Sequence, residues 1–255
     1  MGRQERLRAI LNTLRQSGRI SINDICDSFG VSLITARRDL EILESQGLVE
    51  RTRGGATIKS ITGDSPFFKN LDLRKEQKQR IAKKAIELLN NGQVVAAGGG
   101  TTVYYAMKAL ESSSIHTLTI VTNSITTAWA IINLSKPFNL VHSGGTVRQG
   151  SFECVGEYSS MLFERMYFDC YILGASGVSS EYGVTVADFE ERNLAELIIR
   201  RSKTVILLAD STKIEQSAPY KICDLGKIDV LVTDTQATPS QIETLRSFGI
   251  NVISV

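Results

Sequence analysis

From Gly92 to the end of the chain, short runs of β-branched residues alternate with stretches of helical apolar periodicity. The predicted strands are QVVAA (93–97), LTIVT (118–122), FNLVH (138–142), CYILG (170–174), TVILLA (204–209), DVLVT (229–233) and NVISV (251–255). Between two of them, Val103, Ala106, Met107 and Leu110 share one helical face. This alternation predicts an α/β domain with a mainly parallel sheet covered by helices on both faces.

The loops that follow the predicted strands are rich in glycine and hydroxyl groups. They are GGGTT (98–102), TNS (122–124), SGGTVRQG (143–150), GASG (174–177) and ADSTK (209–213). Loops at the carboxyl ends of parallel strands gather at one edge of the sheet, where ligands bind. Glycine amides and a helix N-terminus attract anions, and Thr101, Thr102, Arg148 and Lys213 add hydroxyls and charge. The loops therefore predict a phosphate site with polar groups left for a sugar.

The first of these loops does not match a nucleotide-binding motif. GGGTT lacks the GxGxxG spacing and has no lysine after it, which argues against a dinucleotide fold and a triphosphatase loop. The alternative for any single loop is a tight turn between a strand and a helix without a ligand. Five such loops on successive strands favour binding.

The N-terminal part has a different pattern, with three short helices. Leu7, Ile10, Leu11 and Leu14 predict a helix over 3–16. Ser21, with Asp24 three residues on, predicts the start of a second helix that Gly30 ends. Ser32 predicts the N-cap of a third helix, LITARRDLEILESQG. Two short helices joined by a glycine-containing turn are typical of a helix-turn-helix, here over about 20–39.

The third helix is predicted to expose DNA-binding groups at its N-terminal half. Leu33, Ala36, Leu40 and Leu43 share the face expected to pack inward. Ile34 and Arg38 point the opposite way, with Thr35 and Arg37 on the flanks. Hydroxyl and guanidinium groups read base edges and bind phosphates in a major groove.

After Gly47, LVERTRGGATI predicts two short strands with a glycine pair between them, and Arg51 and Arg53 near its tip. A basic hairpin beside a recognition helix is a wing. The alternative for residues 1–58 is a helical protein–protein module.

The segment VSLITARRDLEILESQGLVERTRGGAT closely resembles the N-terminal signature of the DeoR family of bacterial transcriptional regulators. The chain departs from the family pattern at Ala36, where isoleucine is usual. Because this position faces inward, the change should affect packing more than DNA contact. The resemblance implies binding of double-stranded operator DNA. The candidate DNA-binding residues are Ser32, Ile34, Thr35, Arg37, Arg38, Arg51, Arg53, Gly54 and Gly55.

The charge distribution agrees with a basic head on an acidic body. Residues 1–84 carry 17 Lys and Arg against 10 Asp and Glu, whereas residues 85–255 carry 12 against 17. The expected domains are a winged helix-turn-helix over 1–58, a linker over 59–74 with Gly63 and Pro66, and an effector-sensing and oligomerisation domain over 75–255. Residues 69–84 hold seven basic groups against two acidic ones, which indicates a solvated helix face or a helix near DNA.

The body also resembles the DeoR effector domain, over about 75–233. The matching stretches are GGGTT, VTNS, SGGTVR, DCYILGASGVSSEYGVTVADFEE and ADSTK. That domain is similar in fold to ribose-5-phosphate isomerase, and the resemblance implies sensing of a phosphorylated sugar. By motif, the phosphate would be held by Gly98, Gly100, Thr101 and Thr102. The sugar end would be lined by Asn123, Gly145, Arg148, Asp169, Asp188, Glu190 and Lys213.

The same comparison argues against an isomerase activity. The isomerases have glycine-alanine-aspartate after the corresponding strand, where this chain has Gly174, Ala175 and Ser176. An isomerase needs a carboxylate that moves a proton between neighbouring carbons of the sugar, and a serine hydroxyl cannot act as that base at neutral pH. Glu190 or Glu191 could act as a base, but no complete acid–base set is present, so we expect no catalytic residues and binding without turnover.

Other features exclude metal and membrane roles. The four cysteines, at 26, 154, 170 and 223, have no CxxC spacing, and the chain has two histidines, so neither a metal site nor a cofactor is expected. Apolar runs such as ITTAWAIINL (125–134) are too short for a bilayer. No signal peptide is expected, which predicts a cytoplasmic protein.

Together these patterns predict a repressor of a carbohydrate catabolic operon that a phosphorylated sugar modulates. A single winged helix buries too little DNA for tight binding, so a homodimer or homotetramer is expected. One alternative is a regulator whose body serves only oligomerisation. A more remote one is a sugar-phosphate isomerase with a DNA-binding appendage.

Overall fold

The computed structural model describes residues 2–45, 48–58 and 67–255. The chain divides into two compact units, Met1–Leu73 and Arg74–Val255. The expected linker falls partly on residues 59–66, which lie outside the described residues. Its later part is a short helix, α4 (Phe67–Asp72), in which Phe67 is buried and meets the Phe68 ring edge to face. Six residues are too few for an apolar period to appear in the sequence.

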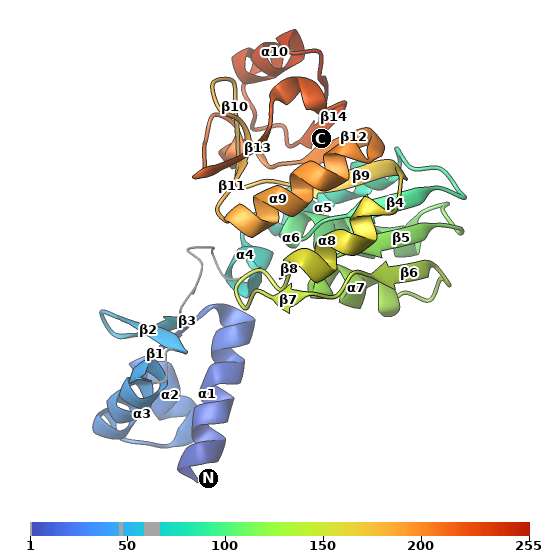
Figure 1. The fold of residues 1–255 in the computed structure, drawn as a ribbon. Coiled ribbons are helices and arrows are strands. Elements are labelled where there is room, and N and C mark those ends of the chain that lie inside the picture. The colour runs from blue at the N-terminus through green and yellow to red at the C-terminus, as the bar shows by residue number, and fades with distance from the viewer. Residues whose placement is uncertain (1, 46–47, 59–66) are drawn as a thin grey trace. The chain divides into compact units, whose positions relative to one another are not determined.

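The first unit is a winged helix-turn-helix. Its elements are α1 (Arg3–Ser17), β1 (Arg19–Ser21), α2 (Ile22–Phe29), α3 (Leu33–Ser45), β2 (Val49–Thr52), β3 (Gly55–Ile58) and α4 (Figure 1). The strands form an antiparallel sheet in the order β1-β3-β2. Ile10, Leu14, Ile25, Leu40 and Leu43 are almost fully buried among these elements. Strand β1, which the sequence pattern did not predict, adds a third strand to the wing.

The predicted helix boundaries of this unit follow from local chemistry. Ser21 Oγ accepts a hydrogen bond from the Asp24 amide at 3.0 Å, and Asp24 Oδ2 accepts one from the Ser21 amide at 3.0 Å. This reciprocal cap satisfies two amides that the helix itself leaves unbonded. Gly18 and Gly30 end α1 and α2 in the left-handed conformation, with φ of 73° and 62°. The caps predicted at Ser21 and Gly30 are confirmed.

The second unit is built on a seven-stranded parallel sheet. The strand order is β15-β14-β12-β9-β4-β5-β6. The strands are β4 (Val94–Ala97), β5 (Thr119–Thr122), β6 (Asn139–His142), β9 (Phe168–Gly174), β12 (Ser202–Leu208), β14 (Val230–Thr233) and β15 (Asn251–Ser254). Each corresponds to one of the seven runs predicted from the sequence. The α/β class with a mainly parallel sheet is therefore confirmed.

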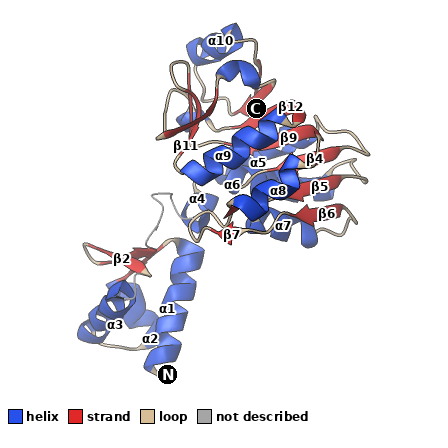
Figure 2. Ribbon diagram, in the orientation of Figure 1, coloured by secondary structure: helices blue, strands red, loops and turns tan. Residues whose placement is uncertain are grey.

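Helices cover both faces of this sheet (Figure 2). Helices α5 (Lys75–Ile86), α6 (Thr101–Ala109) and α7 (Ile125–Ile132) pack side by side on one face, and α8 (Glu157–Glu164) and α9 (Phe189–Arg200) on the other. Helix α10 (Pro239–Ser247) packs beside β15. The short 3₁₀ helices are η1 (Leu110–Ser112), η2 (Ser211–Lys213) and η3 (Leu225–Lys227).

Two smaller sheets complete the second unit. Strands β10 (Gly177–Ser179), β11 (Gly183–Val186) and β13 (Tyr220–Cys223) are antiparallel, and β7 (Thr146–Val147) pairs with β8 (Cys154–Val155). These short pieces carry no clear period, so the sequence did not predict them. They matter because the β7–β8 hairpin bends the chain over the carboxyl ends of β4 and β5.

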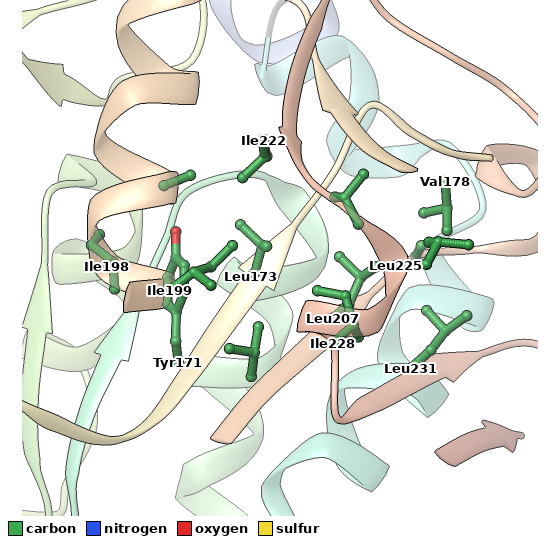
Figure 3. Packing of buried hydrophobic residues seen from close by; sticks show 14 of the residues in the cluster. Tyr171, Leu173, Val178, Ile198, Ile199, Leu207, Ile222, Leu225, Ile228 and Leu231 are labelled. Atoms are coloured by element: carbon green, nitrogen blue, oxygen red, sulfur yellow. The ribbon is translucent and has the colours of Figure 1, made fainter. Parts of the chain in front are cut away.

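One core layer of the second unit lies between the sheet and α9. Ile198 and Ile199 of α9 pack against Tyr171 and Leu173 of β9 (Figure 3). Apolar contact between a helix face and a buried sheet is the main stabilising term in such a layer. No helix among the described residues is long and apolar enough to cross a membrane.

Candidate functional site

The N-terminal half of α3 presents most of the predicted DNA-binding side chains to solvent. Ile34 is 79% exposed, and Arg37 and Arg38 are also exposed. Ser32 caps the helix, because its Oγ accepts a hydrogen bond from the Thr35 amide at 3.3 Å. The exposed guanidiniums and the short hydroxyl side chains therefore share one end of the helix, as a groove-reading surface requires.

One residue that was predicted to face inward, Leu33, is exposed. Ala36, Leu40 and Leu43 are buried, but Leu33 is 52% exposed. Leu33 is the first residue of the helix. The exposed Leu33 and Ile34 add an apolar patch to the surface, suited to contact with a thymine methyl group.

A buried ion pair holds this surface in place. Arg6 of α1 donates from Nε to Asp39 Oδ2 at 2.6 Å and from Nη2 to Asp39 Oδ1 at 3.3 Å. Both side chains are buried, and the hydrogen bond to Asp39 raises the pKa of Arg6. Sequence reasoning missed this pair, although Asp39 lies three residues after Ala36 and so on the inward face. The pair fixes α3 against α1.

The wing residues have two different roles. Arg53 is exposed at the tip, where Gly54 makes the turn with φ of 121°. Arg51 is exposed too, and its Nη1 lies 3.1 Å from Glu41 Oε1 of α3. Gly55 corrects the prediction: it is buried, and a Cβ there would lie 2.0 Å from the Ile20 carbonyl oxygen. Strand packing requires glycine at position 55, and this buried residue is not exposed for contact with DNA.

In the second unit, the predicted phosphate loop opens a helix. Gly98 follows β4, and Gly100, with φ of 89°, is the N-cap of α6 without a capping side chain. The amides of the first turn of a helix have no partner within the helix. Thr101 is buried and Thr102 is half-buried at this turn. The N-terminus of α6 thus offers amides, hydroxyls and a positive dipole to an anion.

A glutamate that the sequence analysis did not select lies directly against this loop. Glu153, from the segment before β8, is buried and packs on Gly99, where a Cβ would lie 2.2 Å from the carboxyl carbon. Asn123 Nδ2 donates to Glu153 Oε2 at 3.3 Å and to the Cys154 carbonyl at 3.0 Å. Gly99 is therefore needed because the Glu153 carboxyl occupies its side-chain space.

Charged side chains from two segments, the loop after β7 and the start of α9, meet beside Glu153. Arg148 Nη1 lies 2.9 Å from Glu191 Oε2, and its Nη2 lies 3.3 Å from Asp188 Oδ2. Asp188 also caps α9 by accepting from the Glu191 amide at 3.0 Å. Burial, followed by the nearby charge of Glu191, raises the pKa of Glu153 well above its usual value. We call Asn123, Arg148, Glu153, Asp188 and Glu191 the buried polar cluster.

Two predicted sugar-end residues lie outside this cluster. Asp169 is at the start of β9, where its Oδ2 accepts from the Val94 amide at 3.0 Å and Lys203 Nζ lies 2.7 Å from its Oδ1. The hydrogen bond from Lys203 lowers the pKa of Asp169. In a parallel sheet this is the edge opposite to the glycine loops, so Asp169 is corrected to a strand-start residue. Glu190 is exposed on the first turn of α9, while its neighbour Glu191 faces Arg148.

The remaining predicted residues lie at the carboxyl edge of the sheet. Gly145, with φ of 119°, packs against the Val155 carbonyl oxygen and Ser159. Lys213 is half-buried in η2, directly after β12. The sequence position of each loop was enough to place these residues. It was not enough to reveal Glu153, because a lone glutamate between a glycine-rich loop and an apolar pair has no motif.

The turn that carries Lys213 also holds the first residue of the second unit. Arg74 Nη2 donates to Ser211 Oγ at 2.9 Å and lies 3.2 Å from Asp234 Oδ1, and Arg74 Nε lies 3.4 Å from Asp210 Oδ1. Asp210 and Asp234 are buried. The point at which the chain enters the second unit is therefore bound to the ends of β12 and β14.

The comparisons with known proteins agree with both halves of the chain. The DeoR-like helix-turn-helix domain matches residues 6–62, and the DeoR C terminal sensor domain matches residues 73–235. The HTH-type transcriptional repressor GlcR of Bacillus subtilis is 32% identical over 257 residues, which cover 99% of this chain and 96% of the relative. The glycerol-3-phosphate regulon repressor of Escherichia coli is 29% identical over 252 residues, covering 99% of both chains.

Among solved structures, ribose 5-phosphate isomerase A from Neisseria gonorrhoeae is similar with a TM-score of 0.41 and 19% identity, over 56% of this chain and 55% of that chain. The two relatives, each aligned over nearly its whole length, are named as a transcriptional repressor and as a regulon repressor. With a helix-turn-helix match at its N-terminal end, a sensor-domain match over most of the rest and relatives that align along the whole chain, this protein belongs to the DeoR family of transcriptional regulators.

Proposed function

We propose that this chain represses a carbohydrate catabolic operon and that a phosphorylated sugar, bound by the second unit, changes its affinity for the operator. In this proposal residues 1–58 bind double-stranded DNA, residues 75–255 sense the effector and assemble a homodimer or homotetramer, and the protein acts in the cytoplasm. The observation that carries it is the open N-terminus of α6, with Gly100 as an uncapped N-cap and two threonines in its first turn. The names of the two relatives support repression, one of a glycerol-3-phosphate regulon.

The contacts within the sensor domain suggest where each end of the ligand binds. Arg148 is already engaged by Asp188 and Glu191, so a phosphate there would have to displace two carboxylates. The N-terminus of α6 has no side-chain cap among the described residues, and the Glu153 carboxyl beside it packs on Gly99 and has a raised pKa. We therefore place the phosphate at Gly100–Thr102 and the sugar hydroxyls toward the buried polar cluster. Lys213, which follows β12 two strands away at the same edge of the sheet, would supply a cation.

The Arg74 contacts offer a physical route for the response. A ligand changes operator affinity only if it binds two arrangements of the protein with different free energies, and a coupling of about 1–3 kcal/mol is usual. Ser211 and Lys213 share η2, and Ser211 holds Arg74. Movement of η2 on binding would therefore act on the residue through which the first unit is attached.

The DNA-binding surface gives the first prediction. Arg38→Ala should lower affinity for the specific operator by about 1–3 kcal/mol if Arg38 reads a base. Arg53→Ala should weaken binding to all DNA sequences and flatten the dependence on salt, because a phosphate contact releases counterions. Gel-shift titrations of specific and random duplexes at two salt concentrations measure both effects. Unchanged affinity in both variants would contradict a DNA-binding role for this surface.

The effector site gives the second prediction. Thr101→Ala combined with Lys213→Ala should abolish the effect of sugar phosphates on operator binding, while operator affinity without ligand stays the same. Both residues lie in the second unit, and the phosphate should dominate ligand affinity through charge-assisted hydrogen bonds. A thermal-shift screen with pentose and hexose phosphates, each paired with its free sugar and with inorganic phosphate, identifies the probe. Calorimetric titration of that pair then measures the two affinities.

Two outcomes would overturn this assignment. A free sugar that binds as tightly as its phosphate would remove the phosphate site from α6. Conversion of the sugar phosphate to its isomer at an enzymatic rate would show that the second unit is a working isomerase in spite of Ser176. The matched control is Thr126→Ala on α7, whose hydroxyl lies 3.0 Å from Ser124 Oγ and outside the proposed phosphate site.

A further inference from the structure

Helix α7 presents an uncovered apolar face to solvent. Ile125 is 40% exposed, Trp129 is 62% exposed and Ile132 is 66% exposed. Their spacings of four and three residues place them on one face of the helix. The opposite face, which includes Ala128 and Ile131, is buried against the rest of the unit. Large apolar side chains gathered in this way on a surface mark an interaction site more often than isolated ones do.

The surroundings of this face are neutral. The α7 sequence, ITTAWAII, has no charged residue, whereas every other described helix has at least one. Beside its C-terminal end, Ile132, Leu134, Phe138 and Leu140 help to line a shallow hollow next to β6. The Nζ of the nearby Lys136 does not extend over this face, because it donates hydrogen bonds to the carbonyls of Leu110 and Ser113. The α7 helix itself therefore offers no charge with which a nucleic acid or a charged segment could pair.

The geometry of the face suits a copy of itself. Trp129 lies between two isoleucines, so two antiparallel α7 helices related by a two-fold axis would pair tryptophan with tryptophan and Ile125 with Ile132. Such self-complementarity is what an isologous interface requires. Strand β6 beside the hollow is an edge strand of the sheet, which an interface on this side would also protect.

We propose that the α7 face, defined as Ile125, Trp129 and Ile132 with the adjoining hollow, is the contact between two copies of this chain. A stable interface buries about 1,200–2,000 Å². The three exposed side chains from two copies supply roughly half of the lower figure, given about 150–250 Å² for an aromatic side chain. The adjoining hollow and the edge of β6 would have to supply the rest. The expectation that two copies are needed to bind DNA rests on the proposed function. The evidence for the α7 face, which is its exposed apolar side chains, does not rest on it.

The chain contains a built-in reporter, because Trp129 is its one tryptophan. Full-length protein without DNA or ligand is diluted from about 50 μM to about 50 nM, a span that covers the affinities common for such interfaces. Sedimentation velocity measures the mass, and the tryptophan emission maximum measures the exposure of Trp129. We expect an oligomer with blue-shifted emission at high concentration, and a shift to the red as the mass falls on dilution.

Ile132→Lys places a charge in the interface and should weaken association by at least about 100-fold. At concentrations where the unaltered chain is an oligomer, this variant should have a smaller mass and the emission of an exposed tryptophan. The matched control is Phe248→Lys at the C-terminal end of α10, an exposed apolar residue on the helix that packs beside the opposite edge strand, β15. It should leave both readouts unchanged. Trp129→Gln, followed by mass alone, provides a second disrupting variant.

Three results would overturn the proposal. The first is a monomer with red-shifted emission at every concentration, and the second is an Ile132→Lys variant that keeps the mass and emission of the original. The third is blue-shifted emission from a monomer, which would mean that another part of the same chain covers Trp129. Because no DNA or sugar phosphate is present, these failures are distinct from a failure of the proposed function.

Discussion

Asp39→Ala is expected to lower the free energy of unfolding of the first unit by about 3 kcal/mol, the lower end of the range for breaking a buried ion pair. The substitution leaves the Arg6 guanidinium buried without its carboxylate, whose oxygens lie 2.6 and 3.3 Å away. The lower end applies because the Arg6 side chain keeps about 10% of its surface exposed, so solvent relieves part of the cost. Loss of this contact should also free α3 from α1 and so weaken operator binding.

The two units can be followed separately in one urea titration. Far-UV circular dichroism reports the helices of both units, whereas tryptophan fluorescence reports only the second, which contains Trp129. In Asp39→Ala, the dichroism transition should acquire an early phase while the fluorescence transition stays in place. Glu41→Ala is the matched control, because it removes an exposed ion pair to Arg51 and should cost less than about 1 kcal/mol. Equal effects of the two variants would contradict the structural role of Asp39.

Arg148→Met is expected to destabilise the second unit by about 3 kcal/mol and to abolish the response to sugar phosphates. Arg148 is the cation of the buried polar cluster, and methionine keeps the apolar stem but removes the charge that Asp188 and Glu191 face. Both carboxylates are about one-fifth exposed, so water relieves part of the cost. The fluorescence transition should move to lower urea, and the early dichroism phase seen for Asp39→Ala should be absent. An unchanged urea midpoint of the fluorescence transition would contradict the stabilising role of Arg148 in the buried polar cluster.

Glu153→Gln is the companion variant and should act in the opposite direction. Burial raises the pKa of Glu153 in the folded protein, so the folded state holds a proton that the unfolded state loses above the usual glutamate pKa. The free energy of unfolding therefore falls as the pH rises from the usual glutamate pKa toward the raised pKa of Glu153, at up to about 1.4 kcal/mol per pH unit. Glutamine removes this loss and can still accept the hydrogen bond from Asn123. Thermal unfolding at several pH values should show a gain for Glu153→Gln that grows toward neutral pH.

The candidate DNA surface was largely predictable from the sequence because its signals are local. Capping residues, glycine stops and the spacing of leucines are properties of short segments, and they placed Ile34, Arg37 and Arg38 on the outer side of α3. The errors arose where contact with another element decides. Leu33, in the first turn of α3, is half exposed, and Gly55 is enclosed because Ile20 of β1 lies against it.

The effector site was predictable only in outline. Strand ends carry the glycine loops to one edge of a parallel sheet, so the positions of Gly100 and Lys213 followed from the strand pattern alone. Asp169 was misplaced because a residue at the start of a strand and one at its end look alike within a motif. Glu153 was missed because its partners, Gly99, Asn123 and Glu191, come from other segments of the chain.

By itself, the sequence determined the family, the two-part organisation and the secondary structure of the main elements, since these depend on periodicity, caps and motifs that neighbouring residues carry. Tertiary structure alone decided which charges are paired and which are open: Asp39 with Arg6, Arg148 with two carboxylates, and Arg74 with the ends of two strands. It also decided that Trp129 and its two neighbouring isoleucines on α7 are exposed among the described residues of the second unit. The physical reason is that burial and ion pairing depend on distances in space between residues far apart in sequence, and no local pattern encodes those distances.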